Sequence, residues 1–455
     1  MGAPRKGSND AAQVTEHLDE LARLADTAGA DVVGRTVQRI EAPTPNYYIG
    51  QGKVEELKAL LQGAGATLVL FDEPLSPVQG VNLETALGMR VMDRTEVILD
   101  IFVTRARSHE AKLQVELAQL EYLLPRLTRM WTHLSRIRGG IGLRGPGETQ
   151  LETDRRVIRR KIGTLRKRLE GVAQHRANQR AGRRTVPSAA LVGYTNAGKS
   201  SLLRALSGAD LFVEDRLFAT LDTVTREVDV GEGYRFRVTD TVGFIRKLPH
   251  HLVASFRATL EEVQDADVLL HVIDASHPSW EEQVAVVEAV LSDMGVAGRE
   301  TADAAPERGA GPPEARSRAS GNGSASLERK RVVHVFNKAD LLPDAAAFLQ
   351  SVRERYPHAL LTATVPAARP VPDGGVAGLR AVLRTSAQAL RPVARISVAL
   401  GDGKLLAALH RDAEVMGQQQ TDGVVVVTAR VEARLLGQLR RGGVSVEILG
   451  SSPPP

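Results

Sequence analysis

A phosphate-binding motif is the first set of residues in this sequence whose types and spacing can do chemistry. It follows a short apolar run at residues 189–192 and precedes a helical pattern. The spacing matches GxxxxGK(S/T), in which backbone N–H groups and the dipole of the following helix bind phosphate. There the lysine reaches the β- and γ-phosphates and the serine is a ligand of Mg²⁺. The residues predicted to contact nucleotide are Gly193, Tyr194, Thr195, Asn196, Ala197, Gly198, Lys199 and Ser200.

Two later motifs narrow the prediction to a guanine nucleotide. The first is DxxG, which contributes to the Mg²⁺ shell and contacts the γ-phosphate; it comprises Asp240, Thr241, Val242 and Gly243. The second is NKxD, directly after an apolar run; it comprises Asn337, Lys338, Ala339 and Asp340. Its aspartate accepts from guanine N1–H and the exocyclic amine, a pair of donors that adenine lacks. The order and spacing of the three motifs predict a GTPase with GTP and Mg²⁺ as cofactors.

A threonine between the first two motifs is expected to close over Mg²⁺ and the γ-phosphate. It lies in the nucleotide-contacting segment Phe218, Ala219, Thr220, Leu221 and Asp222. Thr223 and Thr225 are neighbouring alternatives to Thr220. The predicted metal ligands are Ser200 and Thr220, and the predicted catalytic residues are Lys199, Thr220, Asp240 and Gly243.

Two positions depart from the usual GTPase pattern. Ras-like GTPases have a water-orienting glutamine directly after DxxG, whereas this chain has Phe244, which cannot polarise water. Slow intrinsic hydrolysis is therefore expected. The loop that usually reads Ser-Ala-Lys is Thr362, Ala363 and Thr364 here, and the amide of Ala363 is predicted to meet guanine O6.

The elements that position these motifs predict an α/β multidomain protein. Its P-loop GTPase domain, with a mostly parallel sheet, is expected at residues 185–391. An N-terminal α/β subdomain at 10–104 alternates short strands, beginning with 32–40, with helices. A small α+β domain at 392–450 reads strand, helix, strand, helix, strand. Residues 297–329 are rich in Ala, Gly, Pro and Ser and are predicted to be a disordered insert.

Residues 105–184 predict a long antiparallel helical hairpin. Leucines at positions 113, 117, 120, 124 and 127 continue through Trp131 and Leu134 as a heptad seam, which Pro125 is expected to kink. A second seam runs from Leu151 to Val172. Between the two seams, a tip at 139–147 holds five glycines and a proline, so the chain should turn there.

The positive charge of the chain is concentrated in this hairpin. The whole chain has a net charge of +5, but residues 105–184 contain 20 Lys and Arg against 7 Asp and Glu. Because so much uncompensated charge destabilises a fold unless a polyanion binds it, we predict nucleic acid as the partner. Aromatic residues for base stacking are absent among these cations, so contact to phosphates or duplex shape is expected. The densest cations are Arg155, Arg156, Arg159, Arg160, Lys161, Arg166, Lys167 and Arg168.

Composition excludes several other classes of protein. The chain has no cysteine, so disulfides, thiol catalysis and cysteine-ligated metal centres are excluded. Its 11 histidines are scattered, and the one adjacent pair, His250 and His251, points apart, so no metal site is expected from them. No apolar run reaches membrane-spanning length, and no signal segment is recognisable. We therefore expect a cytoplasmic protein.

A resemblance to a known family rests on the segment after the tip and on the G motifs. The sequence resembles the HflX family of ribosome-associated GTPases over residues 30–390. The resemblance implies binding to the 50S ribosomal subunit and its rRNA through hairpin residues 139–168, and separation of stalled or idle ribosomes under stress. Phe244 in place of glutamine suits a switch whose hydrolysis the ribosome stimulates. We also expect a monomeric protein. The segment that carries it is Gly145, Pro146, Gly147, Glu148, Thr149, Gln150, Leu151, Glu152, Thr153, Asp154, Arg155 and Arg156.

Two other functions remain open from the sequence. A ribosome-assembly GTPase acting on immature large subunits would have the same G motifs and basic surface. A non-enzymatic RNA-binding scaffold would use nucleotide only to stabilise its fold.

Overall fold

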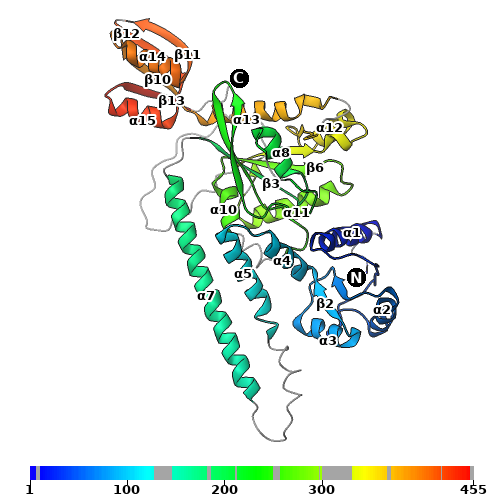
Figure 1. Cartoon of the computed structure of the whole chain (residues 1–455). Coiled ribbons are helices and arrows are strands. Elements are labelled where there is room, and N and C mark those ends of the chain that lie inside the picture. The colour runs from blue at the N-terminus through cyan, green and yellow to red at the C-terminus, as the bar shows by residue number, and fades with distance from the viewer. Residues whose placement is uncertain are drawn as a thin grey trace, which may run out of the picture. The chain divides into compact units, whose positions relative to one another are not determined.

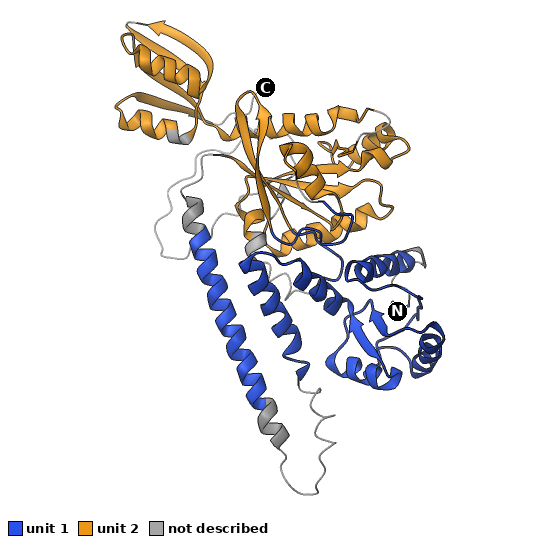
Figure 2. Ribbon diagram, in the orientation of Figure 1, with its two compact units in different colours: residues 1–177, 213–222, 242–260 blue, residues 178–212, 223–241, 261–455 orange. Residues whose placement is uncertain are grey.

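The computed structural model divides the chain into two compact units (Figure 2). Unit 1 comprises residues 1–177, 213–222 and 242–260, and unit 2 comprises 178–212, 223–241 and 261–455. The structure describes residues 1–6, 11–127, 146–181, 186–210, 213–248, 257–296, 298–299, 330–365, 370–421 and 423–450. Most of the predicted tip, most of the predicted insert, and the pair His250 and His251 lie outside these residues. The α/β multidomain prediction is confirmed, while the four predicted domain boundaries stay a prediction.

The N-terminal part of unit 1 is a small α/β layer (Figure 1). Its elements are α1 (Ala11–Thr27), α2 (Gln51–Ala64), β1 (Leu68–Phe71), α3 (Pro77–Leu87) and β2 (Arg90–Asp93). The predicted parallel pairing is present, because Leu68 of β1 lies opposite Arg90 of β2. A capping box starts α3, in which Ser76 and Gln79 bond each other's backbone amides.

The predicted strand at 32–40 is wrong. Within the described residues this segment contributes only isolated bridges, from Val37 to Gly2 and from Ile40 to Arg5. Val32 and Val33 are exposed. A β-branched run forms a strand only where a neighbouring strand and a covering face exist, and the described sheet here has only β1 and β2.

The two hairpin arms are α5 (His109–Leu123) and α7 (Pro146–Ala181), and α4 (Arg94–Arg105) precedes them. Ser108 caps the start of α5 through the amide of Ala111. The predicted seams meet where Leu113 and Leu117 pack with Ile162 and Leu165. The arms are antiparallel, since Glu110 pairs with Arg176 while Glu121 pairs with Arg166.

Two details of the predicted hairpin are corrected. The predicted kink at Pro125 is a break: α5 ends at Leu123 and residues 124–126 form a turn, because proline has no N–H to continue the helical hydrogen bonds. The second arm begins within the glycine-rich stretch, at Pro146, because proline is well tolerated at the first position of a helix.

Unit 2 is built on a seven-stranded sheet in the order β4-β5-β3-β6-β8-β7, with β9 paired to β8. All pairings are parallel except that of β4 with β5. The strands are β3 (Ser188–Gly193), β4 (Val224–Gly231), β5 (Tyr234–Asp240), β6 (Val268–Asp274), β7 (Gly298–Arg299), β8 (Lys330–Asn337) and β9 (Leu360–Leu361). The insert at 297–329 was predicted to be disordered, but two of its residues, Gly298 and Arg299, form strand β7.

Helices cover both faces of this sheet. The helices are α8 (Lys199–Ser207), α10 (Arg257–Asp265), α11 (Trp280–Asp293), α12 (Ala345–Arg353) and α13 (Val376–Leu390), with short 3-10 turns η1 (Ala339–Leu341) and η2 (Pro372–Gly374). Leu203 of α8 and Leu383 of α13 pack with Leu270 on one face. Val284 of α11 and Leu349 of α12 belong to a second cluster on the other face.

The C-terminal part of unit 2 is a four-stranded antiparallel sheet in the order β11-β12-β10-β13. Its elements are β10 (Val393–Ala399), α14 (Gly403–Asp412), β11 (Glu414–Thr421), β12 (Val424–Arg430), α15 (Ala433–Arg441) and β13 (Ser445–Gly450). The sequence predicted three strands in this domain and did not predict β11. This edge strand is mostly exposed and polar, so it has no apolar alternation for a sequence pattern to detect.

Candidate nucleotide-binding site

The phosphate-binding motif forms the turn from β3 into α8, where two glycines allow the backbone to lie against neighbouring strands. Gly193 has φ of 154°, and a Cβ atom there would lie 2.1 Å from the carbonyl oxygen of Val272. Gly198 has φ of 90°, and a Cβ atom there would lie 2.2 Å from Nδ2 of Asn337. Glycine is thus required at both positions, and the turn delivers the N-terminus of α8 to the motif.

Lys199, the first residue of α8, points its ammonium back along the motif. Its Nζ donates to the carbonyl oxygens of Gly193, at 3.1 Å, and Tyr194, at 2.9 Å. The side chain is 6% exposed. Burial lowers the pKa of the Lys199 ammonium to about 8, and the nearby Asp240 carboxylate opposes this shift. The ammonium is therefore mostly charged at pH 7, as a phosphate ligand requires.

The serine of the motif and the aspartate of DxxG lie together. Ser200 Oγ donates to Asp240 Oδ2 over 2.6 Å, which joins the first turn of α8 to the end of β5. The next residue, Thr241, donates from Oγ1 to the carbonyl oxygen of Leu191 in β3, at 2.6 Å. Magnesium prefers hard oxygen ligands. A hydroxyl and a carboxylate at this spacing fit such an ion.

The NKxD motif braces the phosphate-binding turn from β8. Asn337 Nδ2 donates to the carbonyl oxygen of Ala197, at 3.0 Å, in a buried contact. Lys338 has φ of 62°, a strained backbone for lysine, and its ammonium is 2.7 Å from Asp274 Oδ2 at the end of β6. Asp274 was not predicted from the sequence, although a carboxylate at the end of an apolar strand, as in DxxG, is a recognisable signal.

The predicted guanine-recognition segments are joined by hydrogen bonds. Thr362, which is fully buried, donates from Oγ1 to Asn337 Oδ1 at 3.1 Å and accepts from the amide of Ala339 at 3.1 Å. Asp340 lies in η1 and is partly exposed. Ala363 and Thr364 follow Thr362 and are also partly exposed.

The predicted switch segment 218–222 belongs to unit 1, where it is attached to the hairpin arm. Phe218 is buried with φ of 55°, and its ring packs edge-on against Phe102 of α4 with centroids 4.8 Å apart. The Asp222 carboxylate accepts from the amides of Arg107, at 2.9 Å, and Ser108, at 3.1 Å, and from the Ser108 hydroxyl. Asp222 thus binds the N-terminus of α5, a contact that the sequence did not predict.

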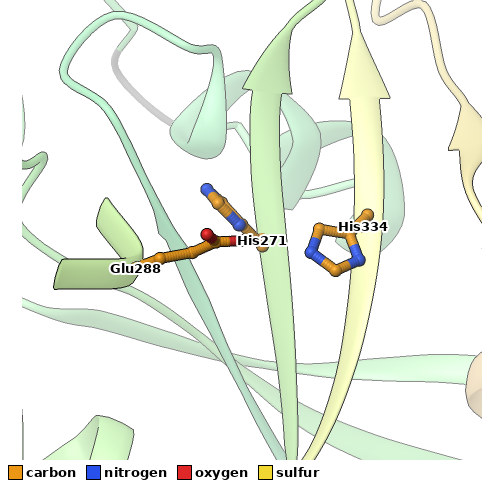
Figure 3. Close-up of side chains that lie close together, drawn as sticks. All are labelled: His271, Glu288 and His334. Atoms are coloured by element: carbon orange, nitrogen blue, oxygen red, sulfur yellow. The ribbon is translucent and has the colours of Figure 1, made fainter. Parts of the chain in front are cut away.

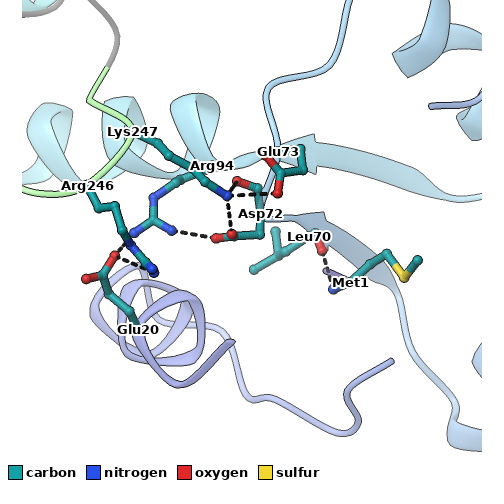
Figure 4. A network of polar contacts seen from close by, with 8 residues as sticks. All are labelled: Met1, Glu20, Leu70, Asp72, Glu73, Arg94, Arg246 and Lys247. Carbon is teal, nitrogen blue, oxygen red and sulfur yellow. Dashed lines mark hydrogen bonds and ion pairs between the residues drawn. The ribbon is translucent and has the colours of Figure 1, made fainter. Parts of the chain in front are cut away.

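The segment after Asp240 and Thr241 is also bound to unit 1. Phe244 and Ile245 are buried. Lys247 reaches Asp72 at 2.6 Å and Glu73 at 2.8 Å, while Arg246 lies 3.4 Å from Glu20 (Figure 4).

A buried arginine ties these carboxylates together. Arg94, at the start of α4, is 1% exposed and pairs with both Glu20 and Asp72, the latter at 2.5 Å (Figure 4). The network therefore connects α1, the end of β1 and α4 to the residues that follow DxxG.

The two units divide the predicted site residues between them. Unit 2 contains the phosphate-binding motif, Asp240, Thr241, the NKxD motif and residues 362–364. The hydrogen bonds described above join these segments to one another. Unit 1 holds 218–222, including Thr220, which is partly buried, together with Val242 and Gly243.

Three family models match the chain. "GTP-binding GTPase N-terminal" matches residues 15–103, "GTP-binding GTPase Middle Region" matches 105–183, and "50S ribosome-binding GTPase" matches 188–299. Among the described residues, no helix is long and apolar enough to cross a membrane.

Individual relatives carry the name "GTPase HflX". The protein of that name from Magnetococcus marinus is 40% identical over 437 residues, which cover 94% of this chain and 92% of the relative. The one from Caldanaerobacter subterraneus is 55% identical over 282 residues, covering 62% of this chain and 66% of the relative. A crystal structure of a GTP-binding protein from Sulfolobus solfataricus in complex with GDP matches with 22% identity and a TM-score of 0.42, covering 86% of this chain and 99% of that one.

Proposed function

This chain belongs to the HflX family of GTPases, and on that premise we propose that it uses GTP to bind the large ribosomal subunit and to separate ribosomes into subunits. The chain is a P-loop GTP hydrolase. Its partner under this proposal is the 50S subunit with its rRNA, its location is the cytoplasm, and it acts as a monomer. Stalled or idle ribosomes under stress are the proposed substrate.

The observation that carries the proposal is the connected set of contacts around the phosphate-binding turn. Lys199 is positioned for the phosphates by two carbonyl groups, and Asn337 holds the turn through Ala197. Ser200 and Asp240 would hold Mg²⁺, which when bound neutralises developing charge on the phosphates. Asp340, with the amide of Ala363, would recognise guanine.

The switch residues offer a route from nucleotide to hairpin along the chain itself. Thr220 is two residues from Asp222, which binds the N-terminus of α5. Gly243 is four residues from Lys247, which binds Asp72 and Glu73. When Thr220 and Gly243 become ordered by the γ-phosphate, the attachments next to them shift, and with them the start of the hairpin arm. Such couplings are typically about 1–3 kcal/mol.

The hairpin supplies the proposed ribosome contact. Helix α7 has 36 residues, which at about 1.5 Å each gives an arm about 54 Å long. Lys161 and Arg166 pair with Glu116 and Glu121 of the other arm, at 2.5 and 2.7 Å, so they are partly neutralised. An exposed basic face still remains on α7 for rRNA phosphates, comprising Arg156, Arg159, Arg160, Lys167 and Arg168.

The experiment is light scattering of 70S ribosomes mixed with the protein and GTP over a range of salt concentrations. We expect scattering to fall as subunits separate, at a rate that decreases steeply as salt rises. Protein with GDP in place of GTP is the control. If scattering does not change with GTP at any salt concentration, ribosome separation is rejected.

A ribosome-assembly GTPase is the second candidate, favoured by the same basic arm and G domain. It differs in substrate, because it binds immature large subunits rather than mature 70S ribosomes. Gradient sedimentation of each particle with protein and a GTP analogue distinguishes the two. Co-sedimentation with immature particles alone would favour assembly.

The scaffold alternative is tested with Lys199→Ala. If nucleotide only stabilises the fold, this variant keeps ribosome function after it has lost GTP binding. Our proposal expects it to lose ribosome separation while the hairpin still binds the large subunit.

A further inference from the structure

Two histidines and a glutamate that belong to none of the nucleotide motifs come together on the sheet of unit 2. His271 lies in β6, His334 in β8 and Glu288 in α11, and one ligand atom from each lies within 4.8 Å of the other two (Figure 3). Strand register explains the meeting, because His271 and His334 are direct partners in the parallel pairing of β6 with β8. Both therefore point to the face that α11 covers.

We propose that His271, Glu288 and His334 form a binding site for a divalent transition-metal ion, with Zn²⁺ as the best match. Two imidazoles and one carboxylate are a known ligand set for zinc, and they leave a fourth position open for water. Softer ligands play no part, since the chain has no cysteine. Magnesium and calcium are poor matches because they prefer oxygen ligands.

The burial of the two imidazoles supports the proposal. His271 is 1% exposed and His334 is 9% exposed. The ring centroids of His271 and His334 lie 5.5 Å apart, and the His334 ring also contacts the Tyr356 ring at 4.4 Å, so both imidazoles belong to the packed interior. A metal ion would bind one nitrogen of each ring.

The geometry needs only a small adjustment. Ligand atoms around a tetrahedral zinc ion at about 2.0–2.1 Å lie about 3.4 Å from one another. The three ligand atoms, which lie within 4.8 Å of one another, would therefore have to approach one another by about 1 Å or more. Small rotations of the three side chains about their Cα–Cβ bonds would supply that movement, while the sheet fixes only the backbone of the two histidines.

A metal here would join the two strands that carry the nucleotide loops. His271 lies three residues before Asp274, which holds Lys338, and His334 lies three residues before Asn337, which holds Ala197. The ion would thus tie β6, β8 and α11 together below these loops. The site shares no residue with the nucleotide-binding set, so it does not depend on the proposed function.

Zinc binding to the full, tag-free chain tests the site. After treatment with chelator, the protein is titrated with Zn²⁺ alone, and bound metal is counted after gel filtration. We expect one ion per chain, bound at least tenfold more weakly by His334→Gln and by Glu288→Gln. His410→Gln is the matched control, because His410 is an exposed histidine bonded to Gln418 in the C-terminal sheet.

Two further readouts keep the test decisive. Saturating Zn²⁺, at a hundredfold excess over its Kd, is expected to raise the Tm by about 5–10 °C in the wild type and less in both variants. Retained GDP binding shows that each variant is folded, and the exposed position of Glu288 makes Glu288→Gln safe if His334→Gln does not fold. The proposal is overturned if wild type and folded Glu288→Gln bind Zn²⁺ with equal affinity and stoichiometry.

Discussion

Substitution of Asp222 tests whether the switch segment controls the hairpin. Its carboxylate accepts three hydrogen bonds at the start of α5, two from the amides of Arg107 and Ser108 and one from the Ser108 hydroxyl. Hydrogen bonds to a charged group contribute about 1.5–3 kcal/mol each, and we take about 1 kcal/mol because the carboxylate is partly exposed. Asp222→Ala should then weaken the interaction between the switch segment and the start of α5 by about 3 kcal/mol. Asp222→Asn should weaken it by about half of that amount.

The assay is the ratio of two affinities for 50S subunits, one with a GTP analogue and one with GDP. This ratio measures the coupling between nucleotide and subunit, and a decrease of about 3 kcal/mol in coupling lowers it by up to about 150-fold. Asp222→Asn should lower it by about tenfold. Free-protein GDP affinity should change by no more than about twofold if Asp222 acts through α5 rather than on the nucleotide.

Two controls make the result specific. Asp402→Ala removes another exposed aspartate that caps a helix, through the amide of Leu405, and should leave the ratio unchanged. The double variant with Ser108→Ala should show non-additivity, since the two side chains are in contact. If Asp222→Ala keeps the wild-type ratio, the attachment at α5 does not transmit the nucleotide state to the hairpin.

The remaining predictions concern the phosphate-binding turn and the basic arm. Gly198→Ala places a Cβ atom 2.2 Å from Nδ2 of Asn337 at a residue with positive φ. The free energy of unfolding, measured in urea, should therefore fall by about 2–4 kcal/mol. An unchanged free energy of unfolding would contradict the close approach of Gly198 to Asn337. The pKa of Lys199 is lowered to about 8, so the free protein loses this charge as pH rises through 8, and GDP affinity should fall above that pH. Lys199→Arg, charged throughout, should show a flat profile from pH 7 to about 8.5, below the pH at which guanine loses its N1 proton. An equally flat wild-type profile over this range would be inconsistent with the lowered pKa of Lys199. Charge reversal at Arg156 and Arg160 should weaken 50S binding. The slope of log affinity against log salt concentration should become shallower by about one unit for each phosphate that the arm no longer neutralises. An unchanged slope would mean that these arginines do not contact phosphate.

Local motifs were predictable because their chemistry depends on neighbours in sequence. The turn from β3 into α8 and the loop at Asn337 are each set by a few consecutive residues and a preceding apolar strand. The hairpin seam at Leu117 and Leu165 was predictable from periodicity for the same reason. Pro125 was recognised as disruptive, but whether a helix kinks or ends there depends on packing that the sequence does not display.

The missed features depend on residues far apart in sequence. Asp222 and Ser108 are separated by 114 residues, and Lys247 and Asp72 by 175, so no spacing rule links them. The meeting of His271 and His334 depends on the register of two parallel strands, which is set by the whole sheet. Strand β11 was missed because an exposed edge strand needs no apolar face.

GTP turnover by the full chain, measured with and without 50S subunits, decides whether the large subunit activates hydrolysis. Phe244 stands where a water-orienting glutamine is usual, and its side chain is 3% exposed, so we expect slow turnover by the protein alone. We expect 50S subunits to stimulate turnover strongly in the wild type and not in Lys199→Ala. If 50S subunits leave turnover unchanged, the large subunit is not the activating partner of this GTPase.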